Sequence, residues 1–190
     1  MSPNAYPRLR ILALLVAVVG ALTALGTQTA QATDNLGPAP EFTHADPGDW
    51  FNSAPLKLAD LRGKVVLLDV WTFGCWNCYR SFPWLKALES SLAGQAFVVV
   101  GVHTPEFDHE REEHDAVAAK NREFGLKHPV MLDNDSSDWR ALNNRYWPAF
   151  YLIDKRGNRR ARFVGEAHEG DRNAHAIEVA VDGLLSELRR

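Results

Sequence analysis

The sequence predicts a three-layer α/β domain, in which a central sheet carries helices on both faces. Two nearly continuous apolar runs, 64–71 and 96–103, have the length and β-branched content of strands that are buried on both sides. Between them, residues 75–92 place apolar side chains at helical spacing. A strand–helix–strand unit of this kind implies a right-handed crossover and a parallel pair of strands. Helices must then cover the sheet.

The remaining elements follow from turn signals and local periodicity. Residues 42–62 carry turn signals around short apolar stretches and are expected to form a hairpin or loop that leads into the core. Residues 107–124 are charged and helical in composition, and Gly125 is placed to end that helix. A short strand, a brief helix capped by Ser136 or Ser137, a hairpin and a final amphipathic helix are expected over 129–132, 136–146, 149–164 and 171–188.

Composition fits one globular domain of ordinary size. The chain has 190 residues, of which 46% are hydrophobic, enough to bury a core after an export segment is set aside. A net charge of −3 and a pI of about 6.2 give no sign of a nucleic-acid partner. Two cysteines are too few for a disulfide-stapled scaffold or a four-cysteine zinc site.

The N-terminal segment has the order of a secretory signal peptide. Two arginines precede an apolar run over 11–25, and small residues end in Ala-Gln-Ala at 30–32. We expect cleavage after Ala32. An uncleaved anchor is the alternative, although the run is shorter than the ~20 residues of a spanning helix. The domain is expected outside the cytoplasm in either case. The chain is thus divided into a signal peptide or N-terminal anchor, a linker and a folded domain, over 1–32, 33–41 and 42–190.

The chemistry is expected at Cys75-Trp76-Asn77-Cys78, just past the first buried strand and at the start of a helix. Backbone N–H groups and the dipole at a helix N-terminus stabilise a thiolate at Cys75 and lower its pKa. The thiolate is the species that attacks disulfides. Cys78 lies one turn inside the helix and can resolve the mixed disulfide, so we expect an exposed nucleophile and a buried partner. Half of a zinc site and two inert core cysteines are the alternatives, but a second ligand pair with metal spacing is missing.

The residues around this motif resemble the thioredoxin superfamily. The stretch 69–78, Asp-Val-Trp-Thr-Phe-Gly-Cys-Trp-Asn-Cys, is similar to the thioredoxin pattern D-x-W-x-x-x-C-x-x-C. More narrowly, the chain is similar to the TlpA-like extracytoplasmic branch and to the thioredoxin-like domain of DipZ proteins. The stretches that carry this narrower resemblance are 75–83, 101–107, 132–135, 146–149 and 151–154. One departure is Gly-Glu-Ala-His at 165–168, where that family usually has Gly-Glu-Gly followed by Tyr.

The resemblance implies a thioredoxin-like fold with a mixed central sheet and a substrate site beside the cysteines. Pro148 matches the family's proline that follows a cis peptide bond, faces the cysteines and lets the Trp147 backbone meet a substrate strand. A trans proline that starts an edge strand is the alternative. The large Trp147 side chain is expected to restrict substrates, and Trp76 and Asn77 to contact them.

Two further polar residues are candidates for roles at the site. Asp69 is the only charge in its apolar strand, and a buried carboxyl with a raised pKa can shuttle protons. The resemblance places it beneath Cys78; a polar group satisfied by a neighbour is the alternative. His103 ends the adjacent strand at the edge where open α/β sheets place their sites. It is expected either to tune the thiolate or to be a hydrogen-bonded core histidine.

Two clusters of potential metal ligands are interpreted as structural. His109 and His114 are five residues apart, so they would not share one face of a helix. We therefore expect residues 109–114 to form a solvated helix. Asp133, Asp135 and Asp138 lack the glycine and distal glutamate of a calcium loop, so we predict a helix cap.

The predicted function is therefore disulfide reduction or exchange on exported proteins. The resemblance implies electrons from a membrane thiol carrier, with cytochrome c maturation as one setting. We expect a monomer with no cofactor beyond the Cys75–Cys78 disulfide. A thiol peroxidase is one alternative, because Thr72 precedes Cys75 by three residues as in peroxiredoxins, although Leu68 replaces their proline. A copper carrier that uses both cysteines and a histidine is another. The sequence leaves the direction of electron flow and the physiological substrate open.

Overall fold

A six-stranded mixed sheet forms the centre of the computed structural model, which describes residues 35–187. The expected signal peptide or anchor lies outside these residues. The strand order is β1-β4-β3-β2-β5-β6. The strands are β1 (Trp50–Phe51), β2 (Val65–Trp71), β3 (Phe97–His103), β4 (Val130–Leu132), β5 (Ala149–Ile153) and β6 (Arg159–Val164). The β2–β3 and β3–β4 pairs are parallel and the others antiparallel, which confirms the predicted mixed sheet.

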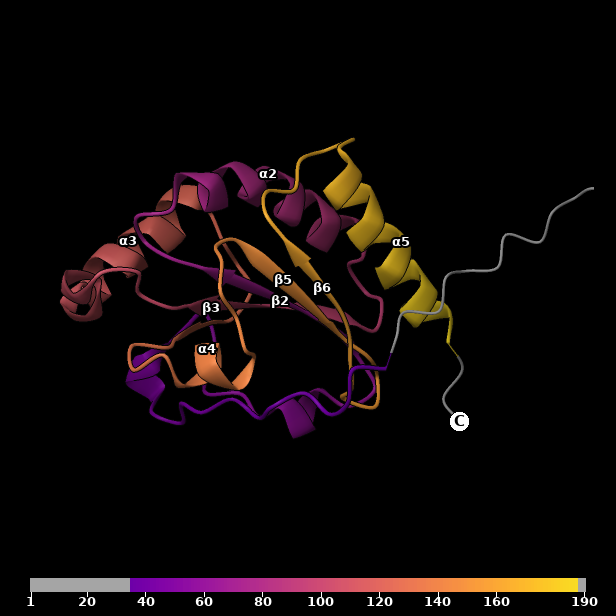
Figure 1. The fold of residues 1–190 in the computed structure, drawn as a ribbon, viewed down its shortest axis with the longest axis horizontal. Helices are drawn as coiled ribbons and strands as arrows, with labels where there is room; N and C mark the ends of the chain where they lie inside the picture. Colours follow the sequence, from indigo (N-terminus) through magenta and orange to yellow (C-terminus); the bar gives the residue numbers. More distant parts are fainter. Residues whose placement is uncertain (1–34, 188–190) are drawn as a thin grey trace, which may run out of the picture. The chain divides into compact units, whose positions relative to one another are not determined.

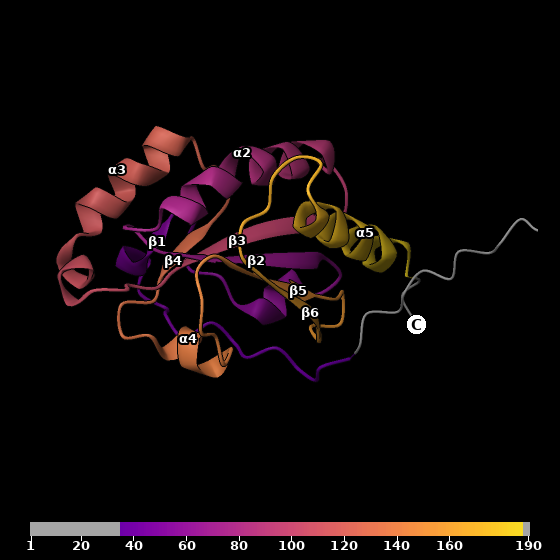
Figure 2. The ribbon, with the colours of Figure 1, turned by 45° about the horizontal axis from the view of Figure 1, so that its top comes forward.

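Helices cover both faces of this sheet, as Figures 1 and 2 show. Three helices lie on one face: α2 (Trp76–Ser91), α3 (His114–Phe124) and α5 (Arg172–Ser186). The other face carries the short α4 (Ser137–Ala141) and the N-terminal segment with the 3₁₀ turns η1 (Pro47–Asp49) and η2 (Leu58–Leu61). A third 3₁₀ turn, η3 (Asp108–Glu112), precedes α3. The predicted three-layer architecture is therefore confirmed.

Strand β2 lies between two hydrophobic cores, and every one of its residues is buried. Leu67 and Trp71 pack in the core under α2, α3 and α5, whereas Val66 and Leu68 pack in the core on the opposite face. Successive side chains of a strand point to opposite faces. A strand covered on both faces must therefore be apolar at nearly every position, which explains the continuous run in the sequence.

The N-terminal part of the domain takes the second of its two predicted forms, a loop that leads into the core. Residues 42–62 form a loop with two 3₁₀ turns, and β1 pairs with the distant β4 instead of forming a hairpin with a neighbour. Residues 36–39 of the expected linker pair with the turn between β5 and β6: Leu36 N donates to Arg159 O at 2.9 Å, and Ala39 N to Gly157 O at 3.0 Å. These long-range backbone hydrogen bonds hold residues 36–39 against the start of β6 and the turn before it.

Two helix boundaries also need correction. The helix predicted over 107–124 is a 3₁₀ turn followed by α3, which ends at Gly125 with a φ of 65°, as predicted. Helix α4 spans five residues, shorter than the expected 136–146, and its N-cap residue Ser136 makes no side-chain capping bond. Asp133 caps this helix instead, since its carboxylate accepts from Asp138 N at 3.0 Å and Trp139 N at 2.9 Å.

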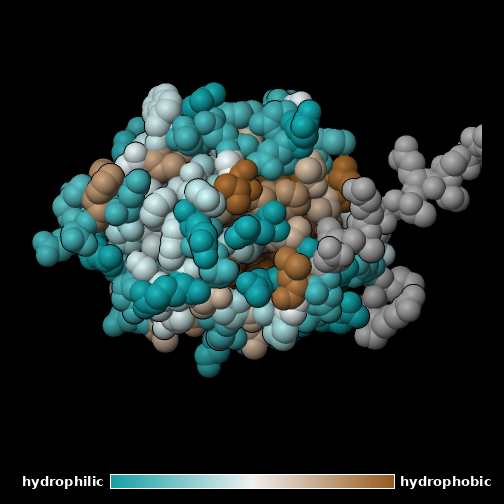
Figure 3. All heavy atoms as spheres, in the orientation of Figure 1, coloured by the Kyte–Doolittle hydropathy of each residue, from teal (hydrophilic) through white to brown (hydrophobic). Residues whose placement is uncertain are grey.

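The surface in Figure 3 is mainly hydrophilic, with small apolar areas near its centre. Between residues 35 and 187, no helix is long and apolar enough to cross a membrane.

Candidate active site

A disulfide joins Cys75 and Cys78 at the N-terminus of α2, directly after β2. Cys75 is the N-cap residue, and its Sγ accepts a hydrogen bond from Cys78 N at 3.0 Å. Cys78 is 1% exposed and is therefore the predicted buried partner, whereas Cys75, expected to be exposed, is only 9% exposed in the disulfide form. Trp76 is 70% exposed beside them, and Asn77 is exposed as well. Cys75 therefore lies at the N-terminus of a helix, as the sequence predicted.

The peptide bond between Trp147 and Pro148 is cis, as the resemblance implied. Strand β5 runs antiparallel to β2, with Ala149 opposite Val70. Pro148 therefore lies beside the end of β2 from which the cysteine loop departs. The Trp147 ring packs on Trp139, with ring centroids 4.1 Å apart. These contacts hold the indole at the edge of the sheet, and its restriction of substrates stays a prediction.

Asp69 is buried in the middle of β2 and is 1% exposed. Because side chains alternate along a strand, Asp69 points to the same face as Leu67 and Trp71, which share a core with Cys78. Its Oδ2 atom has no hydrogen-bond partner among the described residues. Burial raises the pKa of Asp69 to about 7, and the charge on His128 acts in the opposite direction. This carboxyl can therefore gain or lose a proton near neutral pH.

Glu110 belongs to the site and was missed by the sequence analysis, which placed it in a solvated helix. It is 2% exposed in η3, and its carboxylate accepts from Thr72 Oγ1 at 2.6 Å, Gly74 N at 3.1 Å and Glu106 N at 2.8 Å. These bonds hold the loop that leads from β2 to Cys75. Glu110 is buried because these donors lie within reach, which no local pattern in the charged run 107–124 reveals.

His103 supports the same loop from the end of β3. The ring is fully buried, and its Nε2 accepts from Phe73 N at 3.0 Å. Burial lowers the pKa of His103 to about 4, while the charge of Glu110 opposes that shift. The histidine is therefore neutral at pH 7. These contacts fit the hydrogen-bonded core histidine of the sequence analysis, and a direct effect on the thiolate stays a prediction.

The loop 165–168, which departs from the family pattern, is docked on α2. The Arg80 guanidinium pairs with Glu166 at 3.1 Å, and Ala167 N donates to Ser81 Oγ at 3.0 Å. Ala167 is fully buried. Although its sequence differs from the family pattern, this loop therefore packs against the first turns of α2.

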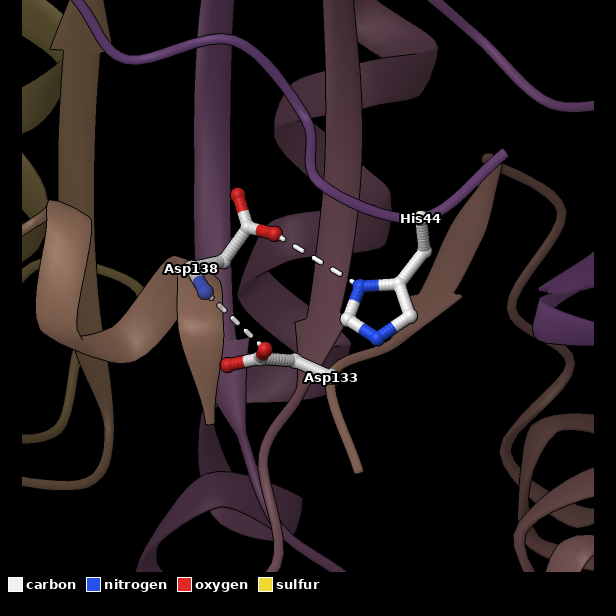
Figure 4. Close-up of side chains that lie close together, drawn as sticks. All are labelled: His44, Asp133 and Asp138. Atoms are coloured by element: carbon white, nitrogen blue, oxygen red, sulfur yellow. Dashed lines mark hydrogen bonds and ion pairs between the residues drawn. The ribbon is translucent and has the colours of Figure 1, made fainter. Parts of the chain in front are cut away.

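His44, Asp133 and Asp138 bring ligand-type atoms within 4.8 Å of one another near α4, as Figure 4 shows. The Asp133 carboxylate already accepts from two α4 backbone N–H groups and from Thr104 Oγ1 at 2.9 Å. Asp138 Oδ2 accepts from Thr43 N at 3.1 Å and lies 3.7 Å from His44 Nδ1. The carboxylates thus cap α4 and anchor residues 43–44, which confirms the predicted helix cap.

Both cysteines of the chain lie in this disulfide, so it is the pair available for thiol–disulfide exchange. A redox disulfide at a helix N-terminus, facing a cis-proline on this sheet, places the protein among the thioredoxin-like thiol–disulfide oxidoreductases. Within that class, the chain belongs to the AhpC/TSA family, whose model matches residues 37–162.

Individual relatives agree with this assignment. The chain is 36% identical to protein DipZ of Mycobacterium tuberculosis over 163 residues, which are 84% of this chain and 22% of DipZ. It is 29% identical to the thiol-disulfide oxidoreductase YkuV of Bacillus subtilis over 79% of this chain and 95% of YkuV. A thiol-disulfide isomerase from Corynebacterium glutamicum has a similar structure, with a TM-score of 0.66 and 25% identity over 79% of this chain and 98% of that chain. The chain spans only 12–22% of the length of its first curated relatives.

Proposed function

We propose that this thiol–disulfide oxidoreductase works as a disulfide reductase outside the cytoplasm. The observation that carries the proposal is the hydrogen bond from Cys78 N to Cys75 Sγ at the helix N-terminus. The same N–H group stabilises a thiolate on Cys75 once the disulfide is reduced. The extracytoplasmic setting is supported by the signal-peptide pattern of 1–32 and by the resemblance to the TlpA-like branch.

In the proposed reaction, the Cys75 thiolate attacks a substrate disulfide and one substrate sulfur leaves as a thiolate. The product is a mixed disulfide between Cys75 and the substrate. Cys78 then transfers its proton to the Asp69 carboxylate, directly or through one water, and attacks Cys75 Sγ. The second substrate sulfur leaves, and the enzyme keeps the Cys75–Cys78 disulfide. A dithiol donor reduces that disulfide again.

The substrate-binding edge is proposed to consist of Trp76, Asn77, Trp147 and Pro148. Trp76 and Asn77 are exposed next to Cys75, and Pro148 directly precedes β5, which pairs with β2 beside the cysteine loop. We propose exported proteins with disulfides as substrates and a membrane thiol carrier as the electron donor, with cytochrome c maturation as one setting. The protein is proposed to act as a monomer with no cofactor other than its disulfide.

The contacts of Thr72 and His103 favour exchange over the two alternatives. The Thr72 hydroxyl donates to Glu110 Oε2 at 2.6 Å, so it is engaged in the loop and not directed to a peroxide at Cys75. His103 Nε2 accepts from Phe73 N, which occupies one of the two ring nitrogens that a copper ion could bind.

Insulin reduction with dithiothreitol as the electron donor tests the activity. We expect the wild-type protein to be active, Cys75→Ser to be inactive and Cys78→Ser to accumulate mixed disulfides. Insulin reduction by Cys75→Ser would contradict the mechanism, and peroxide consumption faster than insulin reduction would favour the peroxidase.

The reduction potential, measured against glutathione, tests the direction of electron flow: a value clearly more negative than that of glutathione supports a reductase. Fractionation of cells that express the full chain tests the location.

A further inference from the structure

Three buried polar atoms without a hydrogen-bond partner gather around Gly101 in the described structure. They are Asp69 Oδ2, Trp71 Nε1 and His128 Nε2. A Cβ atom built on Gly101 would lie 3.4 Å from Trp71 Nε1 and 3.5 Å from His128 Nε2. Gly101 is also the register partner of Asp69 across β2 and β3, so the Asp69 carboxyl lies on the same face. A Cβ atom on Gly101 would also lie 3.0 Å from Val130 Cγ2, so the glycine lets the Trp71 and His128 side chains pack close to the backbone on the face of the sheet that carries Asp69.

His128 links this part of the core to the outer surface of α2. Its side chain is fully buried, and Nδ1 lies 3.3 Å from Glu89 Oε2, whereas the Glu89 side chain is 32% exposed. A carboxylate beside Nδ1 favours the tautomer with the proton on Nδ1, because that N–H is then the donor. The Nε2 lone pair is left without a donor on the side of Asp69. His128 is therefore arranged to accept a proton on one nitrogen and release another to Glu89.

We propose that His128 and Glu89 form the exit path for the proton that Asp69 takes from Cys78. This path extends the proposed function and rests on the role of Asp69 as the proton acceptor in that function. Cys78 and Asp69 are each 1% exposed, and a bound substrate covers the opening at Cys75. The proton therefore needs a route that does not pass the substrate, and the route through His128 leads to a part of α2 beyond the active-site turn.

The proton balance of the path is complete. Cys78 Sγ–H gives its proton to the Asp69 carboxylate as Cys78 attacks Cys75. The neutral Asp69 carboxyl passes the proton to His128 Nε2. His128 then releases its Nδ1 proton to the Glu89 carboxylate, which gives it to solvent. Asp69 returns to its ionised form, and His128 is left with its proton on Nε2. When a dithiol donor reduces the disulfide again, Cys78 regains a proton along the same path in reverse, which restores the Nδ1 proton of His128. No electron moves in these steps.

Electrostatics support the same pairing. The neighbouring strand positions of Asp69 are Gly101 and Phe150, neither of which ionises. His128 is the charged group that acts on Asp69, and it lowers the pKa that burial raises. This influence of His128 makes the Asp69 carboxylate a weaker base, which favours onward release of its proton. Loss of His128 should both slow the release and move the titration of Asp69 upward.

The test compares His128→Gln and Glu89→Gln with the wild-type protein and with His175→Gln, which replaces an exposed histidine on α5. The readout is insulin reduction from pH 6 to 9. We expect His128→Gln to slow turnover about tenfold near pH 7, part of the ~100-fold or larger contribution of a positioned proton-transfer group. Its pH midpoint should rise, because the influence of His128 that lowers the pKa of Asp69 is gone. Glu89→Gln should slow turnover less, and His175→Gln not at all.

A double variant separates the path from a packing role. In an Asp69→Asn background, His128→Gln should slow turnover no further, because both residues act on one proton. Additive slowing with an unchanged pH midpoint would show that His128 only packs, and would overturn the path. A slow Asp69→Asn with wild-type rates for His128→Gln and Glu89→Gln would also overturn the path but leave the base role intact. A wild-type rate for Asp69→Asn would remove the base role and the path together. If His128→Gln does not fold, Glu89→Gln on the partly exposed helix surface decides the question by its rate.

Discussion

Asp69 and Asp133 are both almost completely buried, at 1% and 0% exposure, but their surroundings differ in kind. The Asp133 carboxylate, beside α4, accepts from the N–H groups of Asp138 and Trp139 and from the Thr104 hydroxyl. The Asp69 carboxyl, on the face under α2, has an oxygen with no partner in the part of the chain that the structure describes. Burial is shared by the two residues, whereas hydrogen-bond donors surround only Asp133.

The electrostatic result follows from those donors. Burial raises the pKa of both carboxyls, but at Asp133 the hydrogen bonds from Trp139, Asp138 and Thr104 oppose the shift. At Asp69 the charge of His128 is the opposing influence, and the pKa reaches about 7. A buried carboxylate that is hydrogen-bonded on both oxygens has a structural role, because its donors depend on it. One that lacks donors is free for proton transfer near neutral pH.

The largest effect is expected for Asp69→Asn. The folded protein keeps a proton on Asp69 up to about pH 7, whereas the unfolded chain loses it near pH ~3.9. The free energy of unfolding therefore falls as pH rises through this window, and the loss is complete above pH 7. Asparagine avoids that loss, so the variant should be more stable by about 4 kcal/mol at pH 8, with little difference at pH 4. Its turnover near pH 7 should be slower.

Urea denaturation at both pH values, together with insulin reduction from pH 6 to 8, checks this prediction. Equal stabilities at pH 8 would mean that Asp69 is solvated or hydrogen-bonded in solution. A wild-type rate across the pH range would make it a structural residue, and the contrast with Asp133 would disappear.

Asp133→Ala should have the opposite effect. The N–H groups of Asp138 and Trp139 and the Thr104 hydroxyl lose a buried acceptor, so the free energy of unfolding should fall by about 2 kcal/mol or more. The rate of disulfide exchange per folded molecule should not change. Asp182→Ala, at an exposed position of α5, is the matched control and should unfold like the wild-type protein. Slower exchange in well-folded Asp133→Ala would show that this carboxylate also has a chemical role.

Glu110→Gln tests a carboxylate that is hydrogen-bonded like Asp133 but lies at the redox loop. An amide in place of one oxygen disrupts an accepted bond from Thr72, Gly74 or Glu106, so we expect a loss of about 1 kcal/mol in stability. Removal of the negative charge next to Gly74 should lower the pKa of the reduced Cys75 thiol. Alkylation of Cys75 by iodoacetamide, followed against pH, should then occur at lower pH than in the wild-type protein. An unchanged alkylation profile would restrict Glu110 to holding the loop.

Thr43→Val should produce the smallest effect. The variant removes the hydroxyl that donates to Asp138 Oδ2 but keeps the backbone N–H that donates to the same atom. A loss of about 0.5 to 1 kcal/mol is expected, with no change in exchange activity. Thr43→Ser retains the hydroxyl and should resemble the wild-type protein in thermal denaturation. A loss equal to that of Asp133→Ala would show that the 43–44 anchor carries the stability of the α4 region.

Most of the fold was predictable because its main elements have strong local patterns. The apolar runs at 64–71 and 96–103 became β2 and β3, and the helix expected over 75–92 became α2, each within one residue at either end. The pairing of β1 with β4 was not predictable, because a strand of two residues has no periodicity and its partner lies far along the chain.

The site divides in the same way. The sequence by itself determined where the redox pair lies, because Cys75 and Cys78 are three residues apart at a strand-to-helix junction that local patterns define. Only the tertiary structure decided that Glu110 turns inward to the cysteine loop and that Asp69 Oδ2 and His128 Nε2 have no hydrogen-bond partner among residues 35–187. The physical reason is that hydrogen-bond satisfaction depends on neighbours from other strands and turns. Such neighbours leave no periodic signal in the sequence.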